Sequence, residues 1–502
     1  MSESITAGPP RPARRVRDQV QLIAYADRLS GSLPALARLL DGPLAGLFGG
    51  VHLLPFFLPY DGADAGFDPV DHLTVDPRLG GWPDVRRLGG SLDVVADVIV
   101  NHVSDRSRPV RDVVERGQES PYAGMLLTYD RVFPAGAIED DLTRIVRPRP
   151  GLRFTPLVLG GRRRLLWTTF TSQQIDLDVQ HPAARRYLSQ VLHRLADSGV
   201  AMVRLDAVGY AVKTAGSSCF LTPETMRFVA ALTAEARRLG MEVLAEVHAH
   251  RRYATETATQ VDRVYDFVLA PLILHGLFTG DSAPLHRWLL DRPGNCVTVL
   301  ETHDGIGLLD TGPGPRPGDA GLLSPSQLEA LVSTVHRNSG GTSAASTVPG
   351  GGLYQLSCTA YDAVGRDDRR YLLARLLQLF VPGIPQVHYV GLLAGRNQAG
   401  GTGAGDPREI NRRAYSGTEL GEALRQPVVQ ALLRLIRLRN THPAFGGAFT
   451  VSAEPAGELR MAWHADGARA ELRAWLADAA YRLTITGRGT TQTVTDVAAL
   501  AS

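Results

Sequence analysis

Three carboxylates lie at or near the ends of apolar stretches that are far apart in the chain. Asp206 ends the stretch "MVRLD", Glu246 follows "EVLA", and Asp304 ends "VLETHD". Cleavage of a glycosidic bond with retention of configuration needs a carboxylate nucleophile and a second carboxyl group that donates and then accepts a proton. A third carboxylate can stabilise the positive charge that develops on the sugar ring. If the fold brings them together, these three side chains could transfer a glycosyl group.

Arg204 stands two residues before Asp206, and the two side chains allow two interpretations. They could form a structural ion pair at the end of a strand, because buried charges are usually paired. Alternatively, Arg204 could keep a nucleophilic Asp206 ionised. Glu246 has no obvious partner beside it in the sequence, which suits a proton donor with a raised pKa.

Eight short apolar runs alternate with longer amphipathic stretches, which indicates an α/β fold. The amphipathic stretches include 183–197, 223–239 and 367–380. This alternation predicts a (β/α)8 (TIM) barrel, and the continuous apolar character of the runs suits parallel strands that are buried on both faces. The eight runs are 20–26, 50–57, 94–102, 202–209, 242–248, 265–271, 296–304 and 384–391.

Polar residues gather at the ends of these runs. Besides Asp206, the ends carry Asn101 and His102, then Glu246 with His248, and later His303 with Asp304. In a barrel of this type the carboxyl ends of the strands converge on the catalytic face. The clustering therefore favours the catalytic interpretation of Asp206 over the structural one.

Two intervals are too long for simple connections, and the pattern changes again near the C-terminus. Long excursions on the catalytic face usually shape a binding site. After about residue 446 the apolar residues alternate in short runs, which predicts a small antiparallel β domain. The predicted organisation is a loose tail at 1–18, a barrel at 19–102, 181–305 and 366–445, inserted loop-rich domains at 103–180 and 306–365, and the C-terminal domain at 446–502.

The composition excludes several classes of partner. The chain has 502 residues and a formal net charge of +2, so no strong attraction to nucleic acid or a membrane surface is expected. No apolar run is long enough to span a membrane, and the N-terminal stretch has no apolar segment typical of a secretory signal. The three cysteines form neither a metal-binding spacing nor a disulfide framework, which favours a cytoplasmic location.

The sequence motifs around the strand ends are more specific than the residue types that they contain. The segments "DVIVNH", "VRLDAVGY", "EVLAEVH" and "VLETHD" occur in this order and resemble the four signature regions of the α-amylase superfamily, glycoside hydrolase family thirteen. Further segments resemble its sucrose phosphorylase subfamily over about residues 19–445. They are "VQLIAYADRL", "GVHLLPFFLPYDGADAGFDPVDH", "RPRPGLRFT", "SCFLTPETM", "VDRVYDFVL", "THDGIG" and "INRRAYS".

The resemblance implies a role for each matching residue. Asp206 matches the nucleophile, Glu246 the acid/base and Asp304 the transition-state stabiliser. Residues that match contacts to the bound glucosyl unit are His102, Arg204 and His303, with Phe67 and Gln174 beside the ring and Asp64 and Arg412 as the pair that closes the glucose pocket. Positions that match the phosphate and acceptor contacts are Arg149, His248, Tyr354 and Gln355. The implied reaction transfers glucose to phosphate without a metal or an organic cofactor, in an enzyme that is a monomer or a homodimer.

The sequence departs from the subfamily pattern around the acceptor. Gly350–Gly352 replaces a leucine and an aspartate that contact fructose in the subfamily, and His250, Arg251 and Arg252 follow Glu246 where an aromatic pair is usual. Losing an acid and gaining cations suits an anionic acceptor. We therefore expect sucrose 6′-phosphate as the donor, with Arg251 and His250 at its phosphate, and sucrose as the next alternative. Other interpretations remain. The donor could be glucosylglycerol or glucosylglycerate, or the protein could be a hydrolase, a transglucosidase or a non-catalytic barrel.

Overall fold

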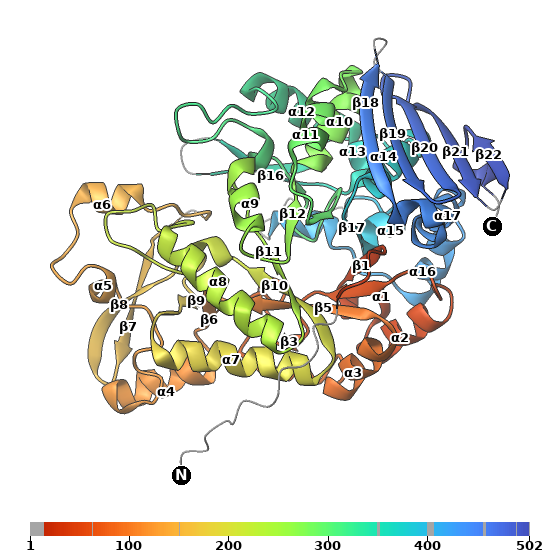
Figure 1. Cartoon of the computed structure of the whole chain (residues 1–502). Helices are drawn as coiled ribbons and strands as arrows, with labels where there is room; N and C mark the ends of the chain where they lie inside the picture. Colours follow the sequence, from red (N-terminus) through yellow and green to blue (C-terminus); the bar gives the residue numbers. More distant parts are fainter. Residues whose placement is uncertain are drawn as a thin grey trace.

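Eight parallel strands close a barrel at the centre of the molecule (Figure 1). The computed structural model describes residues 15–62, 64–149, 151–348, 352–398, 406–454, 458–487 and 489–500. The predicted (β/α)8 barrel is confirmed. Its strands are β1 (Gln21–Ala24), β2 (Gly50–Leu53), β5 (Asp93–Ile99), β10 (Val200–Asp206), β11 (Glu242–Ala245), β12 (Arg263–Asp266), β13 (Cys296–Thr298) and β17 (Ile384–His388).

The order of the strands brings the candidate residues together. The barrel runs β1-β17-β13-β12-β11-β10-β5-β2, and all neighbours are parallel. Strand β10 lies between β5 and β11, with Arg204 opposite Asp97 on one side and Leu244 on the other. Because β10 ends at Asp206 and Glu246 directly follows β11, the two carboxylates lie at the same end of neighbouring strands.

Helices cover the outside of the barrel. The predicted helices correspond to α7 (Pro182–Asp197), α8 (Pro223–Arg238) and α14 (Asp368–Phe380). Helix α8 begins at Pro223 because proline suits the first helical position, and the Thr222 hydroxyl accepts a hydrogen bond from the Thr225 N–H. The other helices of this layer are α1 (Ala26–Ser30), α2 (Leu33–Asp41), α3 (Trp82–Ser91), α9 (Arg251–Ala258), α10 (Leu269–Thr279), α11 (Ala283–Asp291), α15 (Tyr389–Leu392), α16 (Gly417–Leu424) and α17 (Pro427–Thr441).

The segment between β5 and α7 forms a separate layer beside the barrel (Figure 1). Its strands and helices are β6 (His102–Ser104), α4 (Arg108–Arg116), α5 (Tyr129–Val132), α6 (Glu139–Arg144), β7 (Phe154–Leu159), β8 (Arg162–Trp167) and β9 (Gln174–Asp176). Strand β6 pairs with β9, with His102 opposite Asp176. A small apolar cluster around Trp167 and Phe133 is separate from the main core. The pairing of β6 with β9 carries the inserted segment back to the strand ends of the barrel.

A second insertion follows β13. It contains β14 (Ile306–Gly307), α12 (Pro325–Asn338), β15 (Ala344–Thr347), β16 (Leu353–Ser357) and α13 (Ala360–Ala363). The strands form an antiparallel sheet in the order β14-β16-β15. A two-stranded sheet of β3 (Phe57–Leu58) and β4 (Asp71–Val75) lies in the connection between β2 and α3.

The C-terminal part is a five-stranded antiparallel sheet. Its strands are β18 (Ala448–Glu454), β19 (Glu458–Ala465), β20 (Ala468–Trp475), β21 (Ala480–Gly487) and β22 (Thr490–Val494). Buried and half-buried residues alternate along β20, because one face of the sheet packs on the molecule and the other faces outward. Trp463 on β19 donates a hydrogen bond of 2.7 Å to the Phe380 carbonyl at the end of α14. The sheet is therefore joined to the barrel helices.

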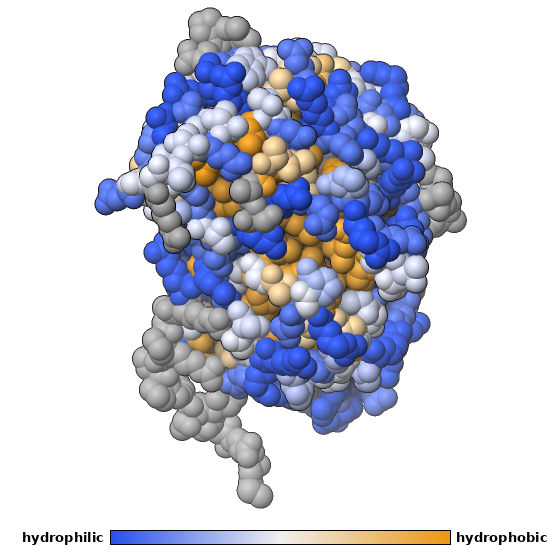
Figure 2. Space-filling view, turned by 90° about the vertical axis from the view of Figure 1, so that its right-hand side faces the viewer, coloured by the Kyte–Doolittle hydropathy of each residue, from blue (hydrophilic) through white to orange (hydrophobic). Residues whose placement is uncertain are grey.

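The face of the molecule shown in Figure 2 carries both hydrophilic and hydrophobic residues. Figure 2 shows mostly hydrophilic residues, with hydrophobic residues gathered near the middle of the view. Among the residues described, none of the helices combines the length and the apolar character needed to cross a bilayer. Both observations agree with the ordinary composition of the chain.

Candidate active site

One guanidinium joins both predicted catalytic carboxylates. The Arg204 side chain is 2% exposed and donates from Nη1 to Asp206 Oδ1 at 3.1 Å. Its Nη2 lies 2.7 Å from Glu246 Oε1. Arg204 also contacts Asp97 on the neighbouring strand β5, and this contact orients the guanidinium. The structural and catalytic interpretations of Arg204 are thus compatible, because the same side chain is paired and lies in the site.

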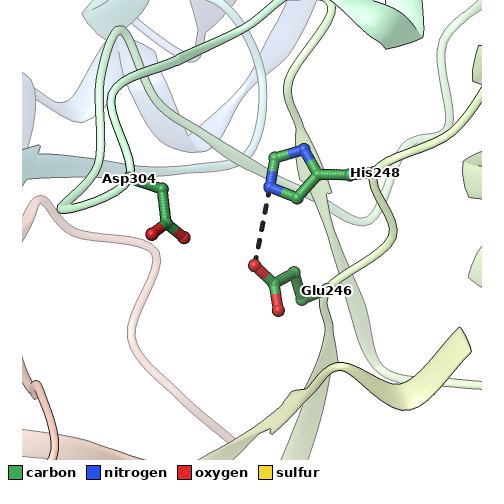
Figure 3. Close-up of side chains that lie close together, drawn as sticks. All are labelled: Glu246, His248 and Asp304. Atoms are coloured by element: carbon green, nitrogen blue, oxygen red, sulfur yellow. Dashed lines mark ion pairs between the residues drawn. The ribbon is translucent and has the colours of Figure 1, made fainter. Parts of the chain in front are cut away.

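Glu246 has three contacts that the sequence did not suggest. Besides Arg204, His248 Nε2 lies 3.5 Å from Glu246 Oε1, as Figure 3 shows, and the Ala207 N–H donates to Glu246 Oε2 at 3.2 Å. Ala207 has φ of 53°, a left-handed conformation that alanine rarely adopts, and this turns its N–H toward Glu246. The partners of Glu246 therefore come from the neighbouring strand β10 and its following turn and from His248, two residues further along.

The two carboxylates titrate as a pair. Burial and the charge of Glu246 raise the pKa of Asp206 well above its usual range. Burial also acts on Glu246, but Arg204 and His248 outweigh it and hold the pKa of Glu246 at about 2. The lowered pKa of Glu246 is opposite to the expected direction, whereas Arg204 does lower the pKa of Asp206, although burial and Glu246 outweigh it. Two buried negative charges beside one guanidinium repel each other, so the two carboxyl groups do not titrate independently.

Asp304 is held as a carboxylate by two arginines and a histidine. Arg408 Nη1 and Arg412 Nη2 each donate to Asp304 Oδ1 at 3.1 Å, and His303 Nε2 lies 3.3 Å from Oδ2. Burial would raise the pKa of Asp304, but these neighbours lower it well below its usual range. A permanently ionised Asp304 could stabilise positive charge on a bound sugar ring.

The Asp64 carboxylate pairs with Arg408. Arg408 Nη2 donates to Asp64, and Gln174 Nε2 donates to Asp64 Oδ2 at 2.6 Å. Arg412, the partner proposed from the sequence, is fully buried and donates from Nε to the His303 carbonyl at 2.7 Å. Arg412 therefore supports the loop that carries Asp304, while Arg408 closes the pocket beside Asp64. The two arginines are four residues apart in one segment, and only the fold separates their roles.

Aromatic rings form the wall next to these acids. The Phe67 ring stacks on His303 with centroids 4.8 Å apart and an angle of 9°. His102 Nε2 lies 2.9 Å from the Phe67 carbonyl oxygen, and burial lowers the pKa of His102. Flat rings beside polar side chains suit a sugar, because its C–H faces pack on rings and its hydroxyl groups bond to the polar atoms.

One cavity contains most of the residues singled out from the sequence. Those that line it are Asp64, Phe67, His102, Arg149, Asp206, Glu246, His248, His303, Asp304, Tyr354 and Gln355. Arg204, Gln174 and Arg412 lie behind this lining and contact it as described above. Lining residues that the sequence did not single out include Pro148, Phe170, Tyr210, Phe220 and Arg408. Arg408 lies in the segment "DPREINRR" next to the quoted "INRRAYS", so the resemblance pointed to the segment but not to this residue.

The cations expected at an anionic acceptor point elsewhere. Arg251 Nη1 lies 3.3 Å from Asp291, and Arg252 Nη1 lies 3.2 Å from Asp319. His250 caps helix α9 and contacts the Ala320 carbonyl through Nε2 at 3.2 Å. None of the three lines the cavity. Of the Gly350–Gly352 segment, only Gly352 lies within the described residues.

The lone lysine of the chain fills a cage of oxygen atoms behind the site. Lys213 Nζ lies 2.6 Å from Asn101 Oδ1, 2.5 Å from the Tyr210 carbonyl and 2.6 Å from Asp176 Oδ2. These oxygens come from the end of β5, from the loop after the catalytic strand β10, and from β9 of the insertion. Lys213 therefore joins the inserted segment to the barrel with a buried positive charge.

Glu246, His248 and Asp304 also offer ligand atoms within 4.8 Å of one another, as Figure 3 illustrates. Such a group could in principle hold a metal ion. However, Glu246 already contacts Arg204, and Asp304 contacts Arg408. These fixed positive charges balance the carboxylates and repel a cation, so the cluster fits a polar organic ligand better than a metal.

Comparison with known proteins places this site in a family. The α-amylase catalytic-domain model matches residues 47–274. A sucrose phosphorylase of Agrobacterium vitis is 52% identical over 91% of this chain and 95% of its own length. A sucrose phosphorylase of Bifidobacterium adolescentis is 45% identical over 91% of this chain and 92% of its own. The chain belongs to the sucrose phosphorylase subfamily of the α-amylase family.

A solved structure within the sucrose phosphorylase subfamily shares the whole architecture. The crystal structure of sucrose 6F-phosphate phosphorylase from Thermoanaerobacter thermosaccharolyticum superimposes with a TM-score of 0.90 at 33% identity, covering 96% of this chain and 99% of that one. Subfamily membership makes the chain an enzyme of the glucosyltransferase type. Membership of the subfamily does not decide which acceptor this enzyme uses, so the acceptor must be argued from the residues of the site.

Proposed function

We propose that this enzyme catalyses the reversible phosphorolysis of sucrose to α-D-glucose 1-phosphate and fructose through a covalent β-glucosyl-enzyme. The observation that carries the proposal is the placement of Asp206 and Glu246 on either side of Arg204 in a cavity that also contains uncommitted positive charge. The similarity to sucrose phosphorylases supports the same reaction.

In the first half-reaction, Asp206 attacks the anomeric carbon of the glucosyl unit. The bond to the fructosyl oxygen breaks, and Glu246 gives that oxygen its proton, so fructose leaves neutral. The donor must therefore bind when Glu246 carries a proton. Asp304, which stays ionised, stabilises the positive charge that develops on the ring.

In the second half-reaction, a phosphate oxygen attacks the anomeric carbon and releases Asp206. Glu246, now a carboxylate, accepts the phosphate proton. Two inversions give net retention. Once Asp206 is an ester it carries no charge, so the cationic side of the cavity attracts an anion more strongly.

Arg149 is suited to receive this phosphate. It lines the cavity and has no hydrogen bond or ion pair among the described residues, in contrast to Arg204 and Arg408. Its charge acts on Asp64, Tyr210 and Tyr354, which line the same cavity. Guanidinium groups bind phosphate oxygens through paired, charge-assisted hydrogen bonds.

The cations around the second insertion favour sucrose over sucrose 6′-phosphate as the donor. A second phosphate on fructose would need its own cationic partner. Arg251 and Arg252, expected there from the sequence, are paired with Asp291 and Asp319 outside the cavity. We therefore reverse the preference drawn from the sequence and assign unphosphorylated sucrose as the donor.

The proposal is tested by assaying phosphorolysis of four donors side by side. The donors are sucrose, sucrose 6′-phosphate, glucosylglycerol and glucosylglycerate, with and without inorganic phosphate, and the readout is glucose 1-phosphate. Sucrose should give the highest kcat/KM, and free glucose should be a minor product when phosphate is present. A higher kcat/KM for another donor would overturn the assignment of sucrose, and glucose formation independent of phosphate would make the enzyme a hydrolase.

A further inference from the structure

Asp310 is a buried acid that no step of the proposed reaction uses. It lies in the short 3-10 helix Leu309–Thr311 of the second insertion and is 2% exposed. Its Oδ1 accepts a hydrogen bond of 3.4 Å from the Ala249 N–H. Its Oδ2 lies 3.7 Å from His248 Nδ1 and has no hydrogen-bond partner among the described residues. A buried carboxylate oxygen directed at an imidazole nitrogen points to a functional contact, because an uncompensated buried charge is costly.

The His248 ring is held between two acids. Its Nδ1 faces Asp310, and its Nε2 lies 3.5 Å from Glu246 Oε1. The ring stacks on Phe267 with centroids 3.9 Å apart and an angle of 18°, and Tyr354 packs against it edge-on. The ring plane is thereby fixed, so that one nitrogen points to the reacting centre and the other to Asp310.

We propose that Asp310 is a positioning residue for the attacking phosphate, because its carboxylate holds the His248 ring as an imidazolium cation that faces the incoming anion. The inference rests on the proposed phosphorolysis. It assigns to Asp310 the selection of an anionic second acceptor over water. Asp310 itself does not touch the substrates.

The surroundings of His248 support the charged form. Burial lowers the pKa of His248, but the two acids Asp310 and Glu246 outweigh it and raise this pKa to about 10. The titratable groups that face the ring are these two acids and Tyr354, and Asp304 lies within the same 4.8 Å cluster as Glu246. Gln355 Nε2 lies 3.2 Å from His248 Nε2, so an imidazolium, which donates from both nitrogens, requires the side-chain amide of Gln355 to turn over and present its oxygen.

A positive ring discriminates between the two possible acceptors. A charge-assisted hydrogen bond is markedly stronger than a neutral one, and phosphate carries negative charge whereas water does not. Losing the charge of His248 should therefore weaken phosphate binding more than it slows attack by water, which depends on the ring only through Glu246. Asp310 controls this difference from a position away from the anomeric carbon.

The test compares wild type, Asp310→Asn, His248→Gln and the double variant. Asparagine keeps the Oδ1 acceptor for Ala249 but removes the charge. For Asp310→Asn we expect a KM for phosphate about tenfold higher at pH 8. The kcat for hydrolysis of α-glucosyl fluoride without phosphate should change by a smaller factor than the KM for phosphate. In the His248→Gln background, Asp310→Asn should not raise the KM for phosphate further, because Asp310 acts through the ring.

The pH profile separates positioning from loss of structure. In Asp310→Asn the pKa of His248 falls, so the KM for phosphate should rise through the neutral range as the pH increases, while wild type should show no such rise below about pH 9. Asp362→Asn is the matched control, because Asp362 is equally buried and ion-paired, with Arg366, but does not line the cavity. It should lower the melting temperature and leave the KM for phosphate unchanged.

A measurement on the wild-type enzyme keeps the proposal testable even if Asp310→Asn does not fold. Two-bond ¹H–¹⁵N spectra of the histidine rings, with His248 identified by its absence in His248→Gln, should show an imidazolium at pH 8. A neutral ring would overturn the proposal, as would an unchanged KM for phosphate in Asp310→Asn. The proposed function would fail separately, through the absence of phosphate-dependent glucose 1-phosphate formation in wild type.

Discussion

At the scale of single residues, the site depends on sharing one cation between two acids. Arg204 touches Asp206 and Glu246 together, and its contact with Glu246 is the shorter. The reaction needs Asp206 as a carboxylate and the proton on Glu246. Sugar hydroxyl groups that donate hydrogen bonds to Asp206 would stabilise its ionised form.

Substitutions of the two acids should have different consequences. Asp206→Asn should abolish transfer from every donor, because no other side chain can form the covalent intermediate. Glu246→Gln should lose roughly a thousandfold on sucrose but keep transfer from α-glucosyl fluoride, whose leaving group needs no proton. The measurements are kcat values for both donors and mass spectrometry of a trapped glucosyl-enzyme. Equal losses on both donors in Glu246→Gln would contradict the assignment of Glu246 as the acid.

Arg408 should be more important for catalysis than its position outside the signature segments suggests. Arg408→Gln leaves Asp64 and Asp304 without a shared cation, and breaking a buried ion pair typically costs about 3–5 kcal/mol. We expect kcat/KM for sucrose to fall at least a hundredfold. Arg413→Gln is the matched control, since Arg413 pairs with Glu419 at the surface. A variant of Arg408 with wild-type kcat/KM would show that the pair with Asp64 is dispensable.

At the scale of elements, the active face depends on how the inserted segment is attached to the barrel. Strand β9 of the insertion pairs with β6, and the side chain of Asp176 reaches Lys213 from β9. The only lysine among 53 basic residues occupies this position. An ammonium group is compact and offers three donors, which match the three oxygens around it, whereas a planar guanidinium does not fit such a cage.

Lys213→Met should destabilise the enzyme by about 3–5 kcal/mol, because Asp176 would remain buried without its cation. Lys213→Arg should restore the charge but not the stability. Urea unfolding followed by tryptophan fluorescence measures both, and hydrogen exchange should show the loss of protection concentrated in β6 and β9. Wild-type stability in Lys213→Arg would contradict the argument from the shape of the cage.

At the scale of the whole molecule, the charges near the cavity make stability depend on pH. Asp68 is buried, and its Oδ1 has no hydrogen-bond partner within the described parts of the chain. Burial and the nearby Asp64 raise the pKa of Asp68 to about 6. The folded protein therefore holds a proton that the unfolded chain releases at lower pH, so stability falls as the pH rises from about 4 to 6.

Asp68→Asn should consequently stabilise the enzyme at neutral pH. Asparagine needs no proton to remain uncharged, so the gain should be roughly 1–3 kcal/mol above pH 6 and should vanish near pH 4. Melting temperatures of both proteins between pH 4 and 8 provide the check. Asp61→Asn, an exposed neighbour paired with Arg78, serves as the control and should not show this pH dependence. A gain that is equal at pH 4 and pH 7 would contradict the buried-charge explanation.

The sequence by itself determined the barrel and predicted that three carboxylates lie at the ends of its strands. Eight apolar runs separated by amphipathic stretches are local patterns, and each records the burial of a strand or of one helix face. Because parallel strands of a barrel open their carboxyl ends to one side, Asp206, Glu246 and Asp304 had to converge once the strands were recognised. The antiparallel character of the C-terminal domain was likewise predicted from alternation that local burial imposes, as along β20.

Only the tertiary structure decided which charges pair. Arg408 and Arg412 are four residues apart, yet one reaches Asp64 and the other supports the His303 loop. Arg251 was expected at the acceptor but pairs with Asp291, and Glu246 has partners that its own segment does not fully reveal. Ion pairs form between side chains that lie tens to hundreds of residues apart, and their geometry depends on loop conformations and on left-handed turns such as Ala207. The local sequence pattern does not indicate those distances, but it does indicate which residues are buried. The fold could therefore be predicted from the sequence, whereas the ion pairs of the site could not.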